Sequence, residues 1–145
     1  MSKSWANPTW FFFHTLIEKI HPNHYLVAKE EIIRHIKRIC SMLPCPDCAQ
    51  HATDYMNKIK TPNTKEECKL MLYIFHNFVN VKTNKPLYDY AALSLYEKVN
   101  LTVSYQLFRQ QFLKKTNNPK MFLESMGRSK FIQELDLWLK TNRLI

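Results

Sequence analysis

Apolar side chains recur every three to four residues along almost the whole chain, which is the spacing of an amphipathic α-helix. Breaks that contain proline or asparagine divide this pattern into segments. The pattern therefore predicts an all-α fold. The expected helices cover about residues 7–20, 27–42, 45–60, 64–81 and 88–100, followed by two more at about 102–115 and 120–141.

Local signals set the predicted ends of several helices. Asn7 followed by Pro8 is typical of a helix N-cap and first turn. Thr64 and Glu67 have the spacing of a capping box. Pro44 is expected to end the second helix, because proline cannot continue the hydrogen-bond ladder.

Each predicted helix has one apolar face that it can bury against the others. We expect a four-helix bundle with a short fifth helix over residues 1–100, and a basic helical extension over 101–145 that packs on the bundle or joins a dimer interface. Phe11, Phe12 and Phe13 cannot all face inward, so Phe11 or Phe12 is expected to meet another element or a dimer partner. The main candidate core positions are Trp10, Ile17, Ile20, Ile32, Ile36, Ile39, Leu43, Ala52, Met56, Leu72, Phe75, Val79, Tyr105, Phe108, Phe112, Phe131, Leu135, Trp138 and Leu139.

The chain has a single glycine, Gly127, among 145 residues. Glycine-rich phosphate loops need at least two closely spaced glycines, so the sequence excludes a Rossmann fingerprint and a P-loop. No stretch approaches the ~20 apolar residues of a membrane-spanning helix. Residues 1–5 lack the apolar core of a signal peptide. We therefore expect a protein that is not secreted.

The formal net charge is +9, and residues 101–145 carry more than half of it, with eight basic and three acidic residues. A basic segment of this kind can indicate an anionic partner such as nucleic acid or a membrane surface. Lysines and arginines that only solvate the surface explain the pattern more simply. We therefore do not expect a nucleic-acid partner.

Cys45 and Cys48 form a Cys-x-x-Cys motif at the start of a predicted helix. Free backbone amides and the helix dipole at such a position favour a thiolate, so the pair could cycle between dithiol and disulfide. Zinc sites also use this motif. His51 would then be a third ligand, although no second close pair of ligands is present. The fourth ligand would come from Cys40, Cys68, His35 or His76.

A second polar cluster lies on the fourth predicted helix and in the turn after it. His76, Asn77 and Asn80 share one helix face beside the apolar stripe, and Lys85 follows in the turn. His76 alone could be a hydrogen-bonded core histidine. The whole set is better explained by a cofactor that carries rings, hydroxyls and phosphates. This cluster favours the redox interpretation of the cysteines.

These motifs together resemble the Erv/ALR family of FAD-linked sulfhydryl oxidases over residues 5–97. The segment Trp5-Ala6-Asn7-Pro8-Thr9-Trp10 is similar to the Trp-Gly-Pro-x-x-Trp opening of single-domain members encoded by large nucleocytoplasmic DNA viruses, with Ala6 in place of glycine. The other elements of the resemblance are Trp10 with His14, Cys45 with Cys48, His76-Asn77-x-x-Asn80, and Lys85.

The resemblance implies FAD at the mouth of a four-helix bundle, and a homodimer. It makes Cys45 the outer sulfur that exchanges with a substrate dithiol and Cys48 the sulfur beside the flavin, with O2 as final acceptor and hydrogen peroxide as product. The residues that it assigns to FAD are Trp10, His14, Cys48, His51, His76, Asn77, Asn80, Lys85 and Tyr96, the last as an adenine-stacking ring after a one-residue gap.

The chain also departs from cellular members of the family. Tyr73 and Tyr90 occupy the two positions of their structural disulfide, so that bridge is absent. Cys40 and Cys68 do not replace it and are expected to be buried, inert thiols. No second Cys-x-x-Cys motif is present. Electrons are therefore expected to come directly from a separate dithiol protein, thioredoxin-like or viral.

Two alternatives remain at this point. One is a zinc-binding helical module whose basic tail binds nucleic acid. The other is a thioredoxin-like disulfide carrier, which the lack of predicted strands disfavours. The resemblance to viral enzymes suggests the host cytoplasm or the virion as the location of the protein.

Overall fold

The computed structural model describes residues 4–114 and 122–145. Within these ranges all regular structure is helical, which confirms the predicted all-α fold. The elements are α1 (Ala6–Lys19), α2 (Pro22–Ser41), α3 (Pro46–Asn57), α4 (Lys65–Lys82), the 3-10 helix η1 (Tyr90–Lys98), α5 (Leu101–Phe112) and α6 (Phe122–Thr141).

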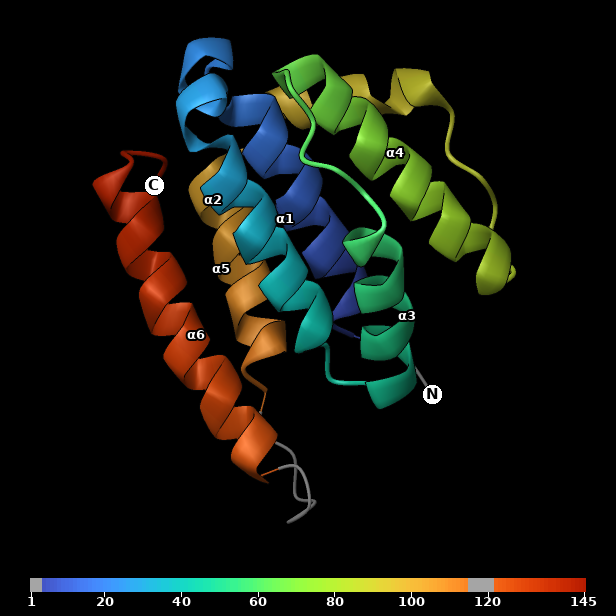
Figure 1. Ribbon diagram of the computed structural model, residues 1–145, viewed down its shortest axis with the longest axis vertical. Coiled ribbons are helices and arrows are strands. Elements are labelled where there is room, and N and C mark those ends of the chain that lie inside the picture. The colour runs from blue at the N-terminus through green and yellow to red at the C-terminus, as the bar shows by residue number, and fades with distance from the viewer. Residues whose placement is uncertain (1–3, 115–121) are drawn as a thin grey trace.

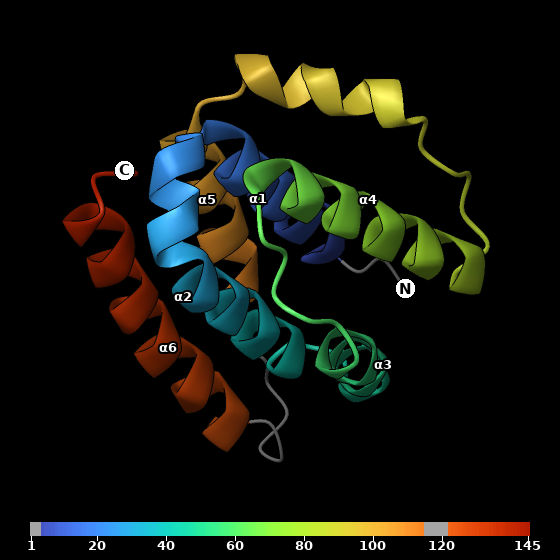
Figure 2. The same cartoon turned by 45° about the horizontal axis from the view of Figure 1, so that its top comes forward.

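Helix α1 runs through the centre of the molecule (Figures 1 and 2). It packs against α4, α5 and η1, while α2 packs against α3 and α4. Helix α6 lies along the outer side of α2 (Figure 1), where Arg38 forms an ion pair with Glu134 at 2.7 Å and Trp138 Nε1 donates to Glu31 at 2.5 Å. Helices α1–α4 thus form the predicted bundle, and the extension covers one side of it.

The extension packs against the bundle through aromatic side chains, as the sequence predicts. Phe12 on α1 is 1% exposed, and its ring centroid lies 5.0 Å from Phe108 and 5.1 Å from Tyr105, both on α5. Phe112 stacks on Phe108 at 5.0 Å. Phe12 is therefore the aromatic that meets another element of the same chain, while Phe11 stays half-buried near Tyr96.

Four predicted boundaries were wrong, among them the end of α5, which lies at Phe112 instead of about residue 115. Helix α2 begins at Pro22 instead of about residue 27, because proline fits the first helical turn and His21 Nδ1 accepts a hydrogen bond from Asn23 N at 3.1 Å. Helix α1 has Trp5 as its N-cap, without a side-chain bond, so Asn7 and Pro8 lie inside its first turn. Helix α3 ends at Asn57, and its last turn does not reach residue 60.

The fifth helix also differs from the prediction. It is a 3-10 helix over Tyr90–Lys98, where Asp89 accepts a bond from Ala91 N at 3.2 Å. Lys19 Nζ donates to the Glu97 carbonyl at 2.6 Å and so connects η1 to the end of α1. None of the described helices combines the length and hydropathy needed to cross a bilayer.

Candidate cofactor and disulfide site

The two cysteines of the motif form a disulfide at the first turn of α3. Cys45 is the N-cap residue, its sulfur accepts a hydrogen bond from Cys48 N at 3.3 Å, and Pro46 starts the helix. Both cysteines are partly buried. After reduction, the free amides and dipole of α3 would stabilise a thiolate here, which is the chemistry predicted from the motif.

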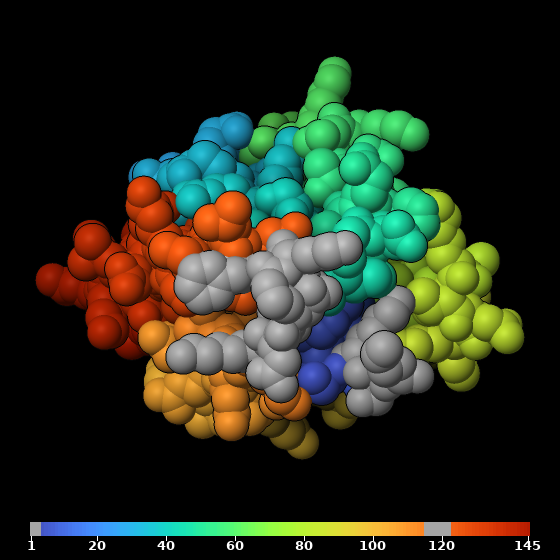
Figure 3. Space-filling model, turned by 90° about the horizontal axis from the view of Figure 1, so that it is seen from below, coloured from blue at the N-terminus to red at the C-terminus, as the bar shows by residue number. Residues whose placement is uncertain are grey.

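A cavity of about 1130 Å³ lies beside this disulfide, between α1, α3, α4 and the segment that follows α4. Ligand cavities commonly measure roughly 300–1000 Å³, so the space suits a ligand as large as a dinucleotide. Seen from below in Figure 3, the start of α1 is set back between α3 and the end of α4. The cavity is lined by seven of the predicted site residues: Trp10, Cys45, Cys48, His51, His76, Asn80 and Lys85.

Stacked rings form part of the cavity wall. The rings of Trp10 and His76 are nearly parallel, at 7°, with centroids 4.1 Å apart. Behind them, Phe75 lies 5.0 Å from Trp10 and stacks on Tyr55 of α3 at 4.7 Å. Flat aromatic faces of this kind pack well against a planar ring system.

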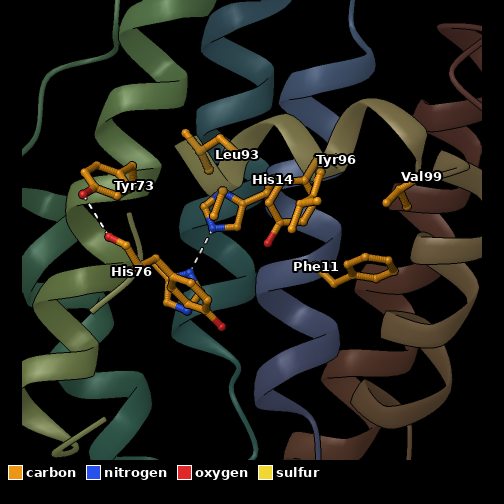
Figure 4. Close-up of a pocket in the computed structure, with 10 residues that line it drawn as sticks. Phe11, His14, Tyr73, His76, Leu93, Tyr96 and Val99 are labelled. Atoms are coloured by element: carbon orange, nitrogen blue, oxygen red, sulfur yellow. Dashed lines mark hydrogen bonds between the residues drawn. The ribbon is translucent and has the colours of Figure 1, made fainter. Parts of the chain in front are cut away.

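His14 lies behind His76 and does not line this cavity. Its Nε2 is 3.0 Å from His76 Nδ1, and both side chains are 6% exposed (Figure 4). Burial lowers the pKa of His14 to about 4, and burial with the nearby His14 and Lys85 lowers the pKa of His76 to about 3. Both rings are therefore neutral at pH 7, so one donates and the other accepts.

Tyr96 is also outside the large cavity. It stacks on His14 at 4.9 Å and lines a smaller cavity of about 200 Å³ between α1, α4 and η1 (Figure 4). His76 borders both cavities. The predicted residues thus divide into a group around the disulfide and a group behind His76.

Asn77 binds the backbone of the segment after α4. Its Oδ1 accepts from Tyr88 N at 2.9 Å, and its Nδ2 donates to the Tyr88 carbonyl at 3.1 Å. Asn80 is 4% exposed, donates to Asn77 Oδ1 at 3.3 Å and lines the large cavity. Asn77 therefore positions a wall of the site, and Asn80 reaches the cavity itself.

Sequence reasoning missed Tyr88. Its ring centroid lies 4.6 Å from that of His76, and it borders the large and the small cavity. Tyr88 belongs to the extended segment between α4 and η1, where no helical periodicity marks inward positions. The only local signal for Tyr88 in the sequence is that an aromatic residue stands two positions after Pro86.

Basic groups stand at the mouth of the cavity. Lys82 and Lys85 are both exposed and line it. The chain turns between them at Asn84, with a φ of 57°, and Lys85 N donates to the Asn80 carbonyl at 2.8 Å. His51 is exposed one turn after Cys48. Two ammonium groups here suit an anionic ligand such as a phosphate.

Tyr73 and Tyr90, which replace the structural disulfide of cellular members, lie in contact. Their rings meet edge to face at 5.2 Å, and Tyr73 Oη donates to the Tyr88 carbonyl at 3.0 Å. An edge-to-face aromatic pair thus joins α4 to the start of η1.

The other two cysteines are free and buried, as predicted. Burial raises the pKa of each thiol to about 12, so neither forms a thiolate near neutral pH. In the part of the chain that the structure describes, no three His, Cys, Asp or Glu side chains are placed to hold a metal ion. The zinc hypothesis therefore gains no support from the described residues.

Comparisons with known proteins identify relatives of similar sequence. The protein named "Putative FAD-linked sulfhydryl oxidase 096R" of Invertebrate iridescent virus 3 is 30% identical over 87 residues, which are 58% of this chain and 59% of that protein. FAD-linked sulfhydryl oxidases of two African swine fever virus isolates, Pig/Kenya/KEN-50/1950 and Warthog/Namibia/Wart80/1980, are 34% identical over 80 residues, 53% of this chain and 67% of theirs. The match thus spans less than two thirds of the iridovirus protein, and no solved structure matches the chain. The model of the Erv1 / Alr family matches residues 7–100, and the chain belongs to that family.

Proposed function

We propose that this protein is an FAD-dependent thiol oxidase that forms disulfides in a separate dithiol protein, with O2 as the final electron acceptor. The observation that carries the proposal is that the Cys45–Cys48 disulfide and the Trp10–His76 ring stack line one cavity. Family membership and the names of the viral relatives support it.

The residues around the cavity fit FAD. The parallel rings of Trp10 and His76 offer a flat face to a ring system, and Asn80 offers a buried amide. Lys82 and Lys85 would hold the negative charge of the two phosphates. When bound, FAD accepts the electron pair of a dithiol and passes it to dioxygen, which gives hydrogen peroxide.

Of the remaining predicted residues, some would position side chains that contact FAD, one would contact FAD in the smaller cavity, and one stands at the rim of the large cavity. His14 would orient His76 through the imidazole hydrogen bond, and Asn77 would hold Tyr88 against the site. Tyr96 faces the smaller cavity, where a second ring of the same ligand could stack. His51 stands at the exposed rim beside Cys48.

The cysteines perform the exchange with the substrate. A substrate thiolate attacks Cys45 Sγ, a new intermolecular S–S bond forms, and the Cys45–Cys48 bond breaks, so that Cys48 leaves as a thiolate at the first turn of α3. The second substrate thiol then attacks the substrate sulfur of the mixed disulfide. The substrate leaves oxidised, and Cys45 and Cys48 hold the two electrons as a dithiol.

We also propose that the protein is a homodimer, as the family resemblance implies. The exposed apolar side chains on α4, among them Leu70 and Ile74, support this because they form a surface that a partner could cover.

Absorption and oxygen consumption of the purified protein test the oxidase proposal. We expect an absorption band near ~450 nm from bound FAD, and consumption of O2 when dithiothreitol is added. A colourless protein that binds zinc and shows salt-dependent DNA affinity would instead support the zinc module. A colourless protein that exchanges disulfides without using O2 would support a flavin-free carrier.

A further inference from the structure

A third cavity, of about 380 Å³, lies beside the first turns of α1. Trp10, His76 and Tyr88 line both this cavity and the large one beside the disulfide. Phe11, His76 and Tyr96 line both this cavity and the smaller one, and Figure 4 shows these three side chains. The third cavity therefore adjoins the other two, and we call it the middle cavity.

Helix α5 of the extension supplies part of the wall of the middle cavity. Leu107 and Gln111 line the cavity, and their spacing of four residues places them on one face of α5. The next row on this helix, Phe108 and Phe112, is buried in the core and holds α5 against α1. Both lining residues lie beyond residue 100, where the match to the family model ends. The extension thus adds two side chains to the surroundings of the site.

Gln111 carries a hydrogen-bond acceptor that the chain does not use. Its carbonyl oxygen Oε1 is buried and accepts no hydrogen bond from the described residues. Most buried polar atoms in proteins have a partner, so the unpaired oxygen indicates a donor on a ligand. Rotation about the last side-chain torsion, which is broad for glutamine, would turn this oxygen toward the cavity that Gln111 lines.

The rest of the lining favours an uncharged, planar ligand group. Among the described residues, no Lys, Arg, Asp or Glu side chain lines the middle cavity. His76 is neutral there, because burial lowers its pKa to about 3. Tyr88 and Tyr96 offer aromatic faces to a ring. The large cavity differs, because Lys82 and Lys85 at its mouth suit phosphates.

We propose that Gln111 is a cofactor-binding residue, and that its Oε1 accepts a hydrogen bond from the amino group of the adenine ring of FAD in the middle cavity. The inference rests on the oxidase function proposed above. FAD consists of a flavin, two phosphates and an adenosine. With the flavin beside the disulfide and the phosphates near the two lysines, the adenosine is the part that remains for the adjoining cavity. Adenine is planar and uncharged, and its amino group is a donor, so it matches the lining and the unpaired oxygen.

The first test compares two flavins. FMN lacks the adenosine, so the wild type should bind FAD more tightly than FMN when the full-length apoprotein is titrated and flavin fluorescence is followed. Gln111→Leu should weaken FAD binding about tenfold, as loss of one buried hydrogen bond would, and leave FMN binding unchanged. Gln110→Leu is the matched control, because Gln110 is exposed on the same helix and does not line the cavity. An unchanged FAD affinity of Gln111→Leu, or an equal loss for FMN, would overturn the proposal.

An FAD analogue that carries purine in place of adenine tests the donor itself. Purine lacks the amino group but keeps the ring. The wild type should bind this analogue about tenfold more weakly than FAD, whereas Gln111→Leu should bind the two equally. Equal wild-type affinities for FAD and the analogue would show that Gln111 does not pair with the amino group.

Leu107→Trp tests whether the ring occupies the middle cavity. The larger side chain would fill part of this space, so FAD binding should weaken at least about tenfold while FMN binding stays unchanged. Val103→Trp is the control, because Val103 lies one turn earlier on α5, is 52% exposed and does not line the cavity. A wild type that binds neither flavin would contradict the oxidase proposal. A wild type that binds FAD, with Gln111→Leu and Leu107→Trp binding it equally well, would contradict this inference alone.

Discussion

The two sides of α1 border regions built in opposite ways. On the α5 side, Phe12 lies in a closed aromatic core with Tyr105 and Phe108. On the α4 side, Trp10 and His14 face stacked and hydrogen-bonded rings beside a cavity of about 1130 Å³. One helix thus carries a packing face and a ligand face. The packing face consists of apolar side chains that fill the core. The ligand face consists of aromatic and polar side chains that are held in place beside a cavity.

The buried histidines also differ between the part of the protein that only packs and the part that borders a cavity. His14 and His76 bond to each other beside the cavities. His35 is 4% exposed between α2 and α6, and neither of its ring nitrogens has a hydrogen-bond partner among the described residues. It packs instead against Trp138 at 4.8 Å. A buried histidine therefore marks a site here only where another polar group orients it.

The largest expected effect is the loss of turnover when a cysteine beside the ligand face is replaced. Cys48→Ser should lower turnover with dithiothreitol at least about 1000-fold, because no dithiol can then form, while FAD stays bound. Oxygen consumption and the FAD content of the purified variant measure both effects. Cys68→Ser is the control, since Cys68 is free, buried and outside the lining of the large cavity, and it should keep most of the activity. Wild-type turnover by Cys48→Ser would refute the assignment.

The next effect concerns the packing face. Phe108→Ala should lower the free energy of unfolding by roughly 3–5 kcal/mol, because a fully buried ring on α5 is lost from the core. Urea unfolding measures this change. Val103→Ala on the same helix, at a position that is 52% exposed, should change stability by less than about 0.5 kcal/mol. A change as small as that of Val103→Ala in the Phe108→Ala variant would show that α5 is not part of the core.

A smaller effect is expected on the ligand face. His14→Ala removes the hydrogen bond to His76 Nδ1 and should weaken FAD binding about tenfold, as one buried hydrogen bond typically would. Titration of the apoprotein with FAD, followed by flavin fluorescence, measures the affinity. His35→Phe should leave it unchanged. If the two variants bind FAD equally well, His14 does not position the site.

The smallest effect is a pH dependence of stability. Burial and the nearby Arg34 and Arg38 lower the pKa of His35 to about 4, so the unfolded chain binds more protons than the folded one between about pH 6.5 and 4. The stability that neutral His35 contributes is complete above this window and is lost as the pH falls through it. Wild-type Tm should therefore drop more between pH 7 and pH 5 than the Tm of His35→Phe. An identical drop would show that His35 does not titrate with unfolding.

The sequence predicted those features that depend on local spacing. The helix start at Cys45 and the shared face of His76 and Asn80 follow from helical geometry. The two hydrogen bonds between Asn77 and the Tyr88 backbone could not be predicted, because Tyr88 lies in an extended segment without periodicity. The sequence does not predict the start of α2 at Pro22, because proline fits a break between helices as well as the first turn of a helix.

The features that the sequence could not predict depend on long-range packing. The contacts of Phe12 with α5 depend on a turn of the chain that no local pattern describes. The position of His14 behind His76, and not at the wall of the large cavity, depends on how α1 and α4 cross. Both outcomes follow from tertiary contacts between segments more than 60 residues apart in the chain.

Anaerobic reduction of bound FAD by dithiothreitol tests the central claim most directly, because the claim is that electrons reach the flavin through Cys45 and Cys48. The wild type and Cys68→Ser should both lose the flavin absorption band, at similar rates. Cys48→Ser should keep the band under the same conditions. Loss of the band in Cys48→Ser at the wild-type rate would contradict the account.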